Sequence, residues 1–219
     1  MQAYGQIDID VVRDNIDFLS ASAHKLGGPK GIGFLYIRNG VRLDPLIHGG
    51  EQERVIRGGT TNVPGAVGFG KAAEFAEADM KERAEKETRL RDHLIHRVLT
   101  EIPYSRLNGH PTRRLPSNAN FSFDFIEVEG MLMSMNMNGI CVSTGSACAS
   151  GSLDPSHVLL AIGLEHQTAH GSLRFSIPDY VTMEQIDRAV DVLKASIARL
   201  RGLSPLYDDF IKGRKATEA

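Results

Sequence analysis

Residues 22–33 read SAHKLGGPKGIG, and this glycine-rich segment separates two runs that predict β-strands. The run before it, Ile16 to Leu19, is short and largely apolar, and the run after it, Phe34 to Ile37, is typical of a buried strand. The glycines and the proline between them indicate a turn. The segment therefore predicts a strand, a loop and a second strand near the beginning of the chain.

Lys25, inside this segment, is a candidate cofactor lysine. A lysine that forms a Schiff base must be held rigidly and must lose its proton, and neighbouring charges and burial can lower its pKa for that purpose. Ser22 and His24 would supply the hydrogen-bond donors that a phosphate group needs beside Lys25. The alternative is a surface lysine in a loop, and spacing alone does not decide between the two.

The remainder of the chain alternates predicted helices and strands. Residues 45–65 are rich in glycine, threonine, asparagine and proline without a period, which indicates a long loop of the kind that carries function. Pro64 to Glu101 is helical in pattern, and its densely charged part, Lys81 to Arg91, is expected to form a solvated face. The alternation predicts an α/β architecture with a domain boundary near residue 80. Further elements are expected as strands at residues 120–125 and 172–177, a methionine-rich helix at 129–137 that packs in the core, and a helix after the capping-box sequence Thr182 to Gln185.

Composition is that of an ordinary globular protein. Of the 219 residues, 42% are hydrophobic and 24% are charged, and the net charge is −2, so neither nucleic acid nor a membrane is indicated as a partner. There is no apolar run of the roughly 18 residues that a transmembrane helix needs, and the first residues lack the pattern of a signal peptide. The eight histidines show no metal-ligand spacing, so no metal is expected. The two cysteines suit a reducing, cytoplasmic compartment.

Three more side chains are considered for chemistry. Cys148 lies in STGSACASG, residues 143–151, a loop of small residues that would leave a thiol accessible, although an incidental loop cysteine is an equal alternative. Cys141 lies between two β-branched residues and is expected to be buried and structural. Arg174 lies within an apolar strand, where its charge needs either a bound carboxylate or an intramolecular salt bridge.

Several runs, taken in order along the chain, match one enzyme family. These runs are Ser22 to Lys25 with Gly28 to Gly33, His48 to Gly50 with Gln52 to Arg54, Arg57 to Thr60, Ser143 to Cys148, Ser172 to Ser176, and Leu203 to Leu206. The chain resembles the C-terminal half of the NifS/IscS-type cysteine desulfurases, which are class V aminotransferase-like, fold-type I enzymes that use pyridoxal phosphate. The resemblance implies that residues 1–80 form the second half of the cofactor-binding large domain. Residues 81–219 would form the small C-terminal α/β domain that carries the Cys148 loop.

The resemblance also implies a set of cofactor-binding residues. Lys25 would hold pyridoxal 5'-phosphate covalently, and Ser22 and His24 would bind its phosphate. Thr60 would reach the phosphate of the other subunit in a dimer, and Gln2 would hydrogen-bond the ring oxygen of the cofactor. The family's aspartate at the pyridine nitrogen, its ring-stacking histidine and its main phosphate-binding turn precede the region that this chain matches. We therefore expect either a partner polypeptide that supplies the N-terminal half or a chain that is a fragment.

The implied reaction is the conversion of L-cysteine to L-alanine. Arg174 would hold the substrate carboxylate. Cys148 would attack the substrate sulfur and carry it as a persulfide to an acceptor or scaffold protein, for iron–sulfur cluster or thio-cofactor assembly. Two alternatives stay open: a selenocysteine lyase-like class V enzyme, and a non-catalytic sulfur-transfer or scaffold subunit.

Overall fold

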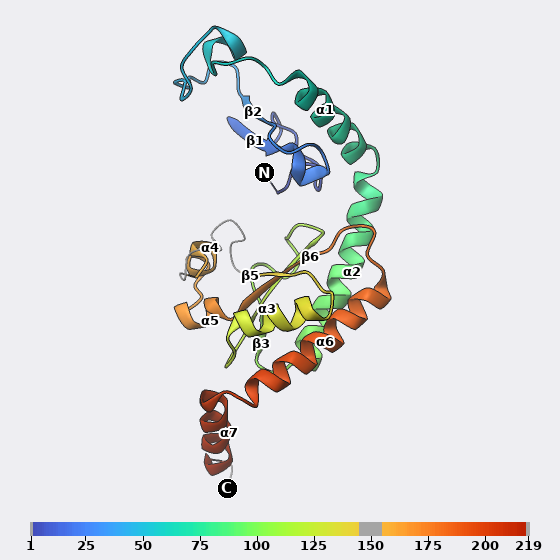
Figure 1. Ribbon diagram of the computed structural model, residues 1–219, viewed down its shortest axis with the longest axis vertical. Helices are drawn as coiled ribbons and strands as arrows, with labels where there is room; N and C mark the ends of the chain where they lie inside the picture. Colours follow the sequence, from blue (N-terminus) through green and yellow to red (C-terminus); the bar gives the residue numbers. More distant parts are fainter. Residues whose placement is uncertain (1, 145–154, 218–219) are drawn as a thin grey trace. The chain divides into compact units, whose positions relative to one another are not determined.

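The chain folds into two compact units, Met1–Ala84 and Glu85–Ala219. The structure is a computed structural model and describes residues 2–144 and 155–217 (Figure 1). Strands and helices occur in both units, which confirms the α/β class expected from the sequence. The division falls within α2, Met80–Glu101, and this helix begins at the residue where the sequence predicted a boundary. The assignment of the units to a large and a small domain of the family stays a prediction.

The first unit contains a two-stranded antiparallel sheet and one long helix. Strand β1, Phe18–Ser22, pairs with β2, Gly33–Ile37, so that Ser22 lies opposite Gly33. The strand expected at residues 16–19 therefore begins and ends later, because the small residues after Leu19 also pair with β2. The remaining elements of this unit are the 3-10 turns η1, Ala23–Leu26, and η2, Gln52–Val55, and the helix α1, Val63–Ala78.

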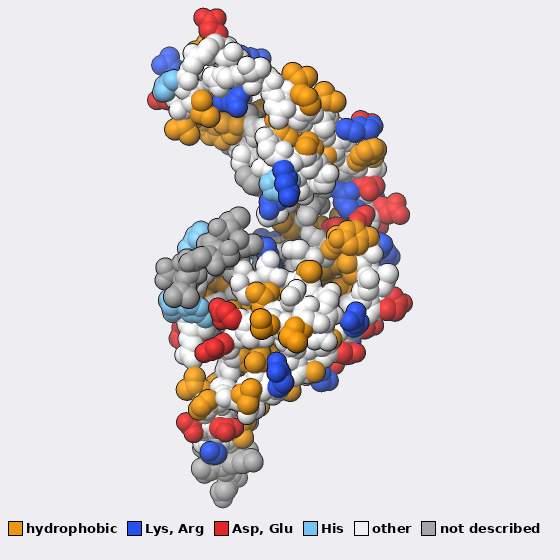
Figure 2. Space-filling view, in the orientation of Figure 1, with side chains coloured by type: hydrophobic (Ala, Val, Ile, Leu, Met, Phe, Trp, Pro, Cys, Tyr) orange, Lys and Arg blue, Asp and Glu red, His pale blue; other side chains and the backbone are white. Residues whose placement is uncertain are grey.

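Helix α1 carries apolar side chains both toward and away from the core of the first unit. Phe69 and Ala72 are buried against the small core of the first unit. On the other side, Val67 and Phe75 remain 68% and 62% exposed, and Figure 2 shows hydrophobic side chains along the outside of this helix. Lys71 lies one helical turn from both residues, pairs with Glu74 at 2.8 Å, and places its ammonium 4.5 Å from the centroid of the Phe75 ring. The outer side of α1 therefore combines exposed apolar side chains with a charged pair.

The single helix expected from Pro64 to Glu101 is in fact two helices. The side chain of Asn62 accepts a hydrogen bond from the Gly65 amide at 3.1 Å and caps the first helix. Asp79 leaves the helical conformation, with φ −116° and ψ 9°, and separates α1 from α2. No glycine or proline marks this break, and the sequence pattern therefore missed it.

The second unit is built on a four-stranded antiparallel sheet with strand order β3-β4-β6-β5. Its strands do not follow each other in sequence order, because β6 returns between β4 and β5. The strands are β3, Ser105–Leu107; β4, Asn118–Phe123; β5, Ser143–Thr144; and β6, Ser172–Ser176. The helices besides α2 are α3, Val128–Met137; α4, His157–Ala161; α5, His166–His170; α6, Met183–Arg201; and α7, Pro205–Thr217.

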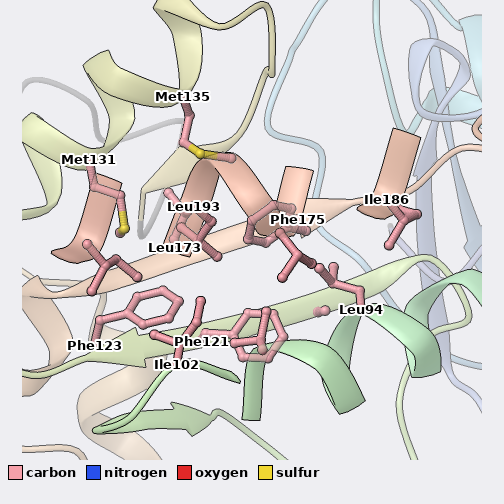
Figure 3. Packing of buried hydrophobic residues seen from close by; sticks show 14 of the residues in the cluster. Leu94, Ile102, Phe121, Phe123, Met131, Met135, Leu173, Phe175, Ile186 and Leu193 are labelled. Carbon is pink, nitrogen blue, oxygen red and sulfur yellow. The ribbon is translucent and has the colours of Figure 1, made fainter. Parts of the chain in front are cut away.

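One face of this sheet carries the main hydrophobic core. Phe121 from β4 and Leu173 from β6 are fully buried and pack with side chains of α2, α3 and α6 (Figure 3). Met131 and Met135 of α3 are also fully buried, which confirms the expected packing role of the methionine-rich helix. The capping box at the start of α6 is confirmed as well, because the Thr182 hydroxyl accepts from the Gln185 amide at 3.3 Å and the Gln185 side chain accepts from the Thr182 amide at 3.0 Å.

The charged run in α2 is more buried than its composition indicated. Glu87, Leu90 and Arg91 are each 95% or more inaccessible, with exposed fractions of 4%, 4% and 5%. The Arg91 guanidinium donates to the Asp92 carboxylate at 2.7 Å and to the Leu115 carbonyl at 3.1 Å. The prediction of a wholly solvated face was therefore wrong, because apolar residues at helical spacing bring their charged neighbours into the core. Among the helices of the described residues, none combines the length and apolar character that crossing a membrane requires.

Candidate functional site

The candidate cofactor lysine lies on a short, well-anchored turn. In η1, Ala23–Leu26, the buried Ala23 and the partly buried Leu26 pack on the core of the first unit, whereas His24 and Lys25 are exposed. This follows from the 3-10 geometry, in which residues three apart share a side and the two between them point elsewhere. Gly27 ends the turn with a φ of 77°, a left-handed conformation that glycine adopts without strain. The turn thus fixes the backbone of Lys25 and leaves its side chain accessible.

Two glycines allow this turn to approach its neighbours closely. A Cβ at Gly33 would lie 2.6 Å from the Ala21 carbonyl oxygen of the paired strand. A Cβ at Gly28 would lie 3.0 Å from the Cβ atoms of Ala23 and Ala72, so any larger residue would push η1 away from α1. The glycines of the segment SAHKLGGPKGIG therefore fix the position of the lysine.

The other expected cofactor residues occupy three places in the first unit. Ser22 ends β1 and directly precedes η1, so the chain brings it together with His24 and Lys25. Thr60 is exposed in the loop between η2 and α1, and Gln2 is exposed in the N-terminal segment. A hydroxyl, an imidazole and an accessible amine on one turn form a donor set that fits an aldehyde cofactor with a phosphate group. The roles of all five residues stay predictions.

Arg174 lies on the second unit, on the face of the sheet opposite the hydrophobic core. Its neighbours in β6, Leu173 and Phe175, point into the core, so the alternation of the strand directs Arg174 to the other face. The guanidinium Nε is buried and has no hydrogen-bond partner among the described residues. A buried N–H that lacks an acceptor costs about 1–3 kcal/mol. Such a donor is suited to a ligand that brings a negatively charged oxygen.

A row of polar side chains flanks Arg174, and no sequence motif marks it. In the register of the sheet, Arg174 lies opposite Asn120 of β4 and opposite Ser143 of β5. Asn108, which follows β3, donates through Nδ2 to the Asn120 Oδ1 at 2.6 Å. The signal was available in the alternation of polar and apolar residues in NANFSF and SLRFS. Its meaning depends on which strands pair, and the sequence does not state the pairing.

The predictions for the two cysteines differ in how they compare with the structure. Cys148 lies outside the described residues, so its expected role as the sulfur acceptor stays a prediction. Cys141 is exposed, and the expectation of a buried structural cysteine was wrong. Ile140 and Val142 both pack against the main core, and in an extended segment the residue between them faces the opposite way.

Comparison with known proteins identifies the family. The sequence model of the family described as "Aminotransferase class-V" matches residues 1–189. The chain belongs to the class-V aminotransferase family. The cysteine desulfurases of this family use pyridoxal phosphate bound covalently to a lysine.

Relatives within the class-V aminotransferase family bear the names of cysteine desulfurases. The chain is 54% identical over 217 residues to the cysteine desulfurase IscS of Clostridium botulinum strain Hall, which covers 98% of this chain and 55% of that protein. A solved structure of a NifS-like protein is 34% identical, with a TM-score of 0.79, and covers 91% of this chain and 51% of that one. The NifS-like protein of Rickettsia africae is 28% identical, with a TM-score of 0.80 and coverages of 90% and 51%. The chain therefore spans about half the length of the relatives it matches.

Proposed function

We propose that this chain is the C-terminal portion of a cysteine desulfurase, which converts L-cysteine to L-alanine and a persulfide. The observation that carries the proposal is the buried Nε of Arg174, which has no hydrogen-bond partner within the described ranges, in a chain 54% identical to a cysteine desulfurase. An arginine in that state is suited to bind the carboxylate of an amino acid, because the guanidinium fork matches two carboxylate oxygens. A scaffold subunit without catalysis has no need of such a donor.

Pyridoxal phosphate, held covalently by Lys25, would supply an electron sink for the negative charge that develops on the substrate. Ser22 and His24 would donate hydrogen bonds to its phosphate, and Gln2 would donate to its ring oxygen. Thr60 would reach the phosphate of the other subunit in a homodimer-like assembly. The exposure of Lys25, His24 and Thr60 in the first unit is compatible with these contacts.

The chain's own residues would then act on L-cysteine as follows. Arg174 binds the substrate carboxylate and orients the amino acid. The Lys25 amine, once free, takes the proton from the α-carbon. The Cys148 thiolate attacks the substrate sulfur, so that a sulfur–sulfur bond forms while the bond between the substrate's β-carbon and sulfur breaks. That carbon keeps the electron pair, gains a proton and leaves as L-alanine, and the sulfur stays on Cys148 as a persulfide.

A partner chain is part of the proposal. The exposed apolar side chains of α1, Val67 and Phe75, support a second polypeptide that carries the remaining half of the family's fold. A sulfur-acceptor or scaffold protein would receive the persulfide sulfur for iron–sulfur cluster or thio-cofactor assembly. The reducing conditions that keep the Cys148 side chain a free thiol favour a cytoplasmic location.

The test is visible absorption spectroscopy with added pyridoxal phosphate. The chain is measured alone and mixed with a polypeptide that carries the family's N-terminal half, before and after L-cysteine or L-selenocysteine. We expect a yellow band that requires the second chain, changes with L-cysteine and is absent in Lys25→Ala, together with L-alanine production that is absent in Cys148→Ala. A band that responds only to L-selenocysteine would favour a selenocysteine lyase. No band in any mixture would favour a non-catalytic subunit.

A further inference from the structure

We propose that Asn120 is a second donor to the substrate carboxylate beside Arg174, and that Asn108 is a positioning residue that fixes the Asn120 amide in the donating orientation. The inference rests on the proposed function, because it concerns the carboxylate of the same amino acid. It adds one residue of β4 and one residue that follows β3, which neither the sequence motifs nor the comparisons single out. Its basis is the register of the sheet and a pair of hydrogen bonds.

The register places these residues in one row across the sheet. Asn120 lies opposite Arg174 in the pairing of β4 with β6, and Ser143 lies opposite Arg174 on the other side. Residues directly opposite each other on antiparallel strands have Cβ atoms about 4.5–5.5 Å apart. The backbone N–H of Asn108 donates to the Asn120 carbonyl at 2.8 Å and extends the row by one residue beyond β3. A carboxylate bound to Arg174 would therefore have Asn120 and Ser143 as its neighbours.

The hydrogen bonds of Asn108 decide which end of the Asn120 amide is available. Asn108 is 5% exposed, and its Nδ2 donates to the Asn120 Oδ1 at 2.6 Å and to the Ser122 hydroxyl at 2.9 Å. Since the Asn120 Oδ1 is engaged by a donor, the Asn120 NH2 group is the end left for a ligand. A carboxylate only accepts hydrogen bonds, so this orientation is the one that binds it.

Asn108 is itself held firmly at this place. Arg114 Nη2 donates to the Asn108 carbonyl at 2.6 Å, in addition to the backbone bond from Asn108 to Asn120. The Asn108 Oδ1 is buried and has no hydrogen-bond partner among the described residues. An unpaired buried acceptor costs folding free energy. The arrangement is therefore better explained by the orientation it imposes on Asn120 than by stability.

The decisive variant is Asn108→Asp, which reverses the donor and keeps the shape. A carboxylate at residue 108 accepts from the Asn120 NH2 group and turns the Asn120 Oδ1 toward the ligand, where it repels a carboxylate. Ser122→Ala is the matched control, because it removes the other acceptor of Asn108 without changing what Asn120 presents. Asn120→Ala removes the proposed donor directly, and it decides the question if Asn108→Asp does not fold.

The first measurement is a titration of the full chain with L-alanine. Binding is monitored through the side-chain amide signals in ¹H–¹⁵N NMR spectra. We expect L-alanine to shift the Asn120 amide signal of the wild-type chain. The dissociation constant should rise by about tenfold or more in Asn108→Asp and Asn120→Ala, and by less than about twofold in Ser122→Ala. The absence of a shift at Asn120 in the wild-type chain, or equal weakening in the control, overturns the proposal.

The second measurement is the kinetics of the assembled enzyme with L-cysteine. A carboxylate contact exists before and during the reaction, so Asn108→Asp should raise KM by about tenfold and change kcat by less than about threefold. A purely structural role for Asn108 would lower the active fraction and leave KM unchanged, which would overturn the inference. If L-alanine binds as expected but the assembly does not desulfurate L-cysteine, the proposed function fails and the positioning role stands.

Discussion

Replacement of Arg174 by methionine is expected to stabilise the unliganded chain and to abolish binding of an amino-acid carboxylate. The guanidinium Nε is buried without a partner among the described residues, and removing such a donor recovers its desolvation cost. Methionine keeps an unbranched stem of similar length, so the packing along β6 is retained. The variant therefore removes the free-energy cost of the unpaired guanidinium and leaves the packing of the sheet unchanged.

The magnitude follows from the energetics of an unsatisfied donor. A buried unpaired polar group costs about 1–3 kcal/mol, and the half-buried position of Arg174 places it in the lower part of that range. We expect the free energy of unfolding to rise by about 1–2 kcal/mol. For a chain of this size, that corresponds to an increase in the melting temperature of about 2–8 °C.

Arg201→Met is the matched control, because Arg201 is a buried arginine with all its contacts inside the protein. Its guanidinium donates to the carbonyls of Asp124, Pro103 and Tyr104 at 3.1, 2.7 and 3.1 Å. We expect that variant to lose about 3 kcal/mol, since three hydrogen bonds from a buried, charged donor to backbone carbonyls would be lost. Thermal unfolding followed by circular dichroism measures both variants. A decrease in melting temperature for Arg174→Met comparable to that of Arg201→Met would refute the reasoning and make Arg174 a structural residue.

Three other predictions concern the second unit. Met131→Ala should lower the free energy of unfolding by about 2–5 kcal/mol, measured by urea denaturation, because the side chain is fully buried in the main core. Thr182→Ala should cost about 1 kcal/mol in the same assay through loss of the capping box, and Thr182→Ser should restore most of it. Hydrogen bonds from Arg97 and Lys194 lower the pKa of Glu101 from 4.5 to about 2. A lowered pKa stabilises the fold above pH 4.5, and this contribution is lost as the pH falls toward 2. The melting temperature of Glu101→Gln should therefore be below that of the wild type at pH 6. The difference between the two melting temperatures should shrink between pH 4.5 and 2. A difference that does not depend on pH would contradict the stabilising role of the Glu101 carboxylate.

The sequence predicted those features of the fold that depend on local patterns. The helix at residues 129–137, the strand at 172–177 and the capping box at Thr182 are all present within a residue or two. Each rests on hydrophobic periodicity or on capping chemistry that acts over a few residues. The turn that carries Lys25 was also recognisable, because its glycines are required by close backbone approaches.

Features that depend on distant parts of the chain were not predictable in the same way. The burial of Glu87 and Arg91 follows from the packing of α2 on elements far away in sequence, and the break at Asp79 carries no glycine or proline signal. The row of Asn108, Asn120 and Arg174 arises because β6 inserts beside β4, which no local pattern reveals. Recognition of Arg174 as a candidate came from its apolar neighbours, whereas its companions became visible only in the register of the sheet.

The strict alternation of β4 and β6 also limits how the gene can change in length. An insertion or deletion of one codon within either strand would exchange the two faces, so that Arg174 and Asn120 would enter the core and Phe121 and Leu173 would leave it. Such a change removes the anion-binding row and the core packing in a single event. Length variation is therefore tolerated only between the strands and helices, for example around the 79% exposed Tyr180 that follows β6. An epitope or a fluorescent reporter intended for this protein should be inserted there.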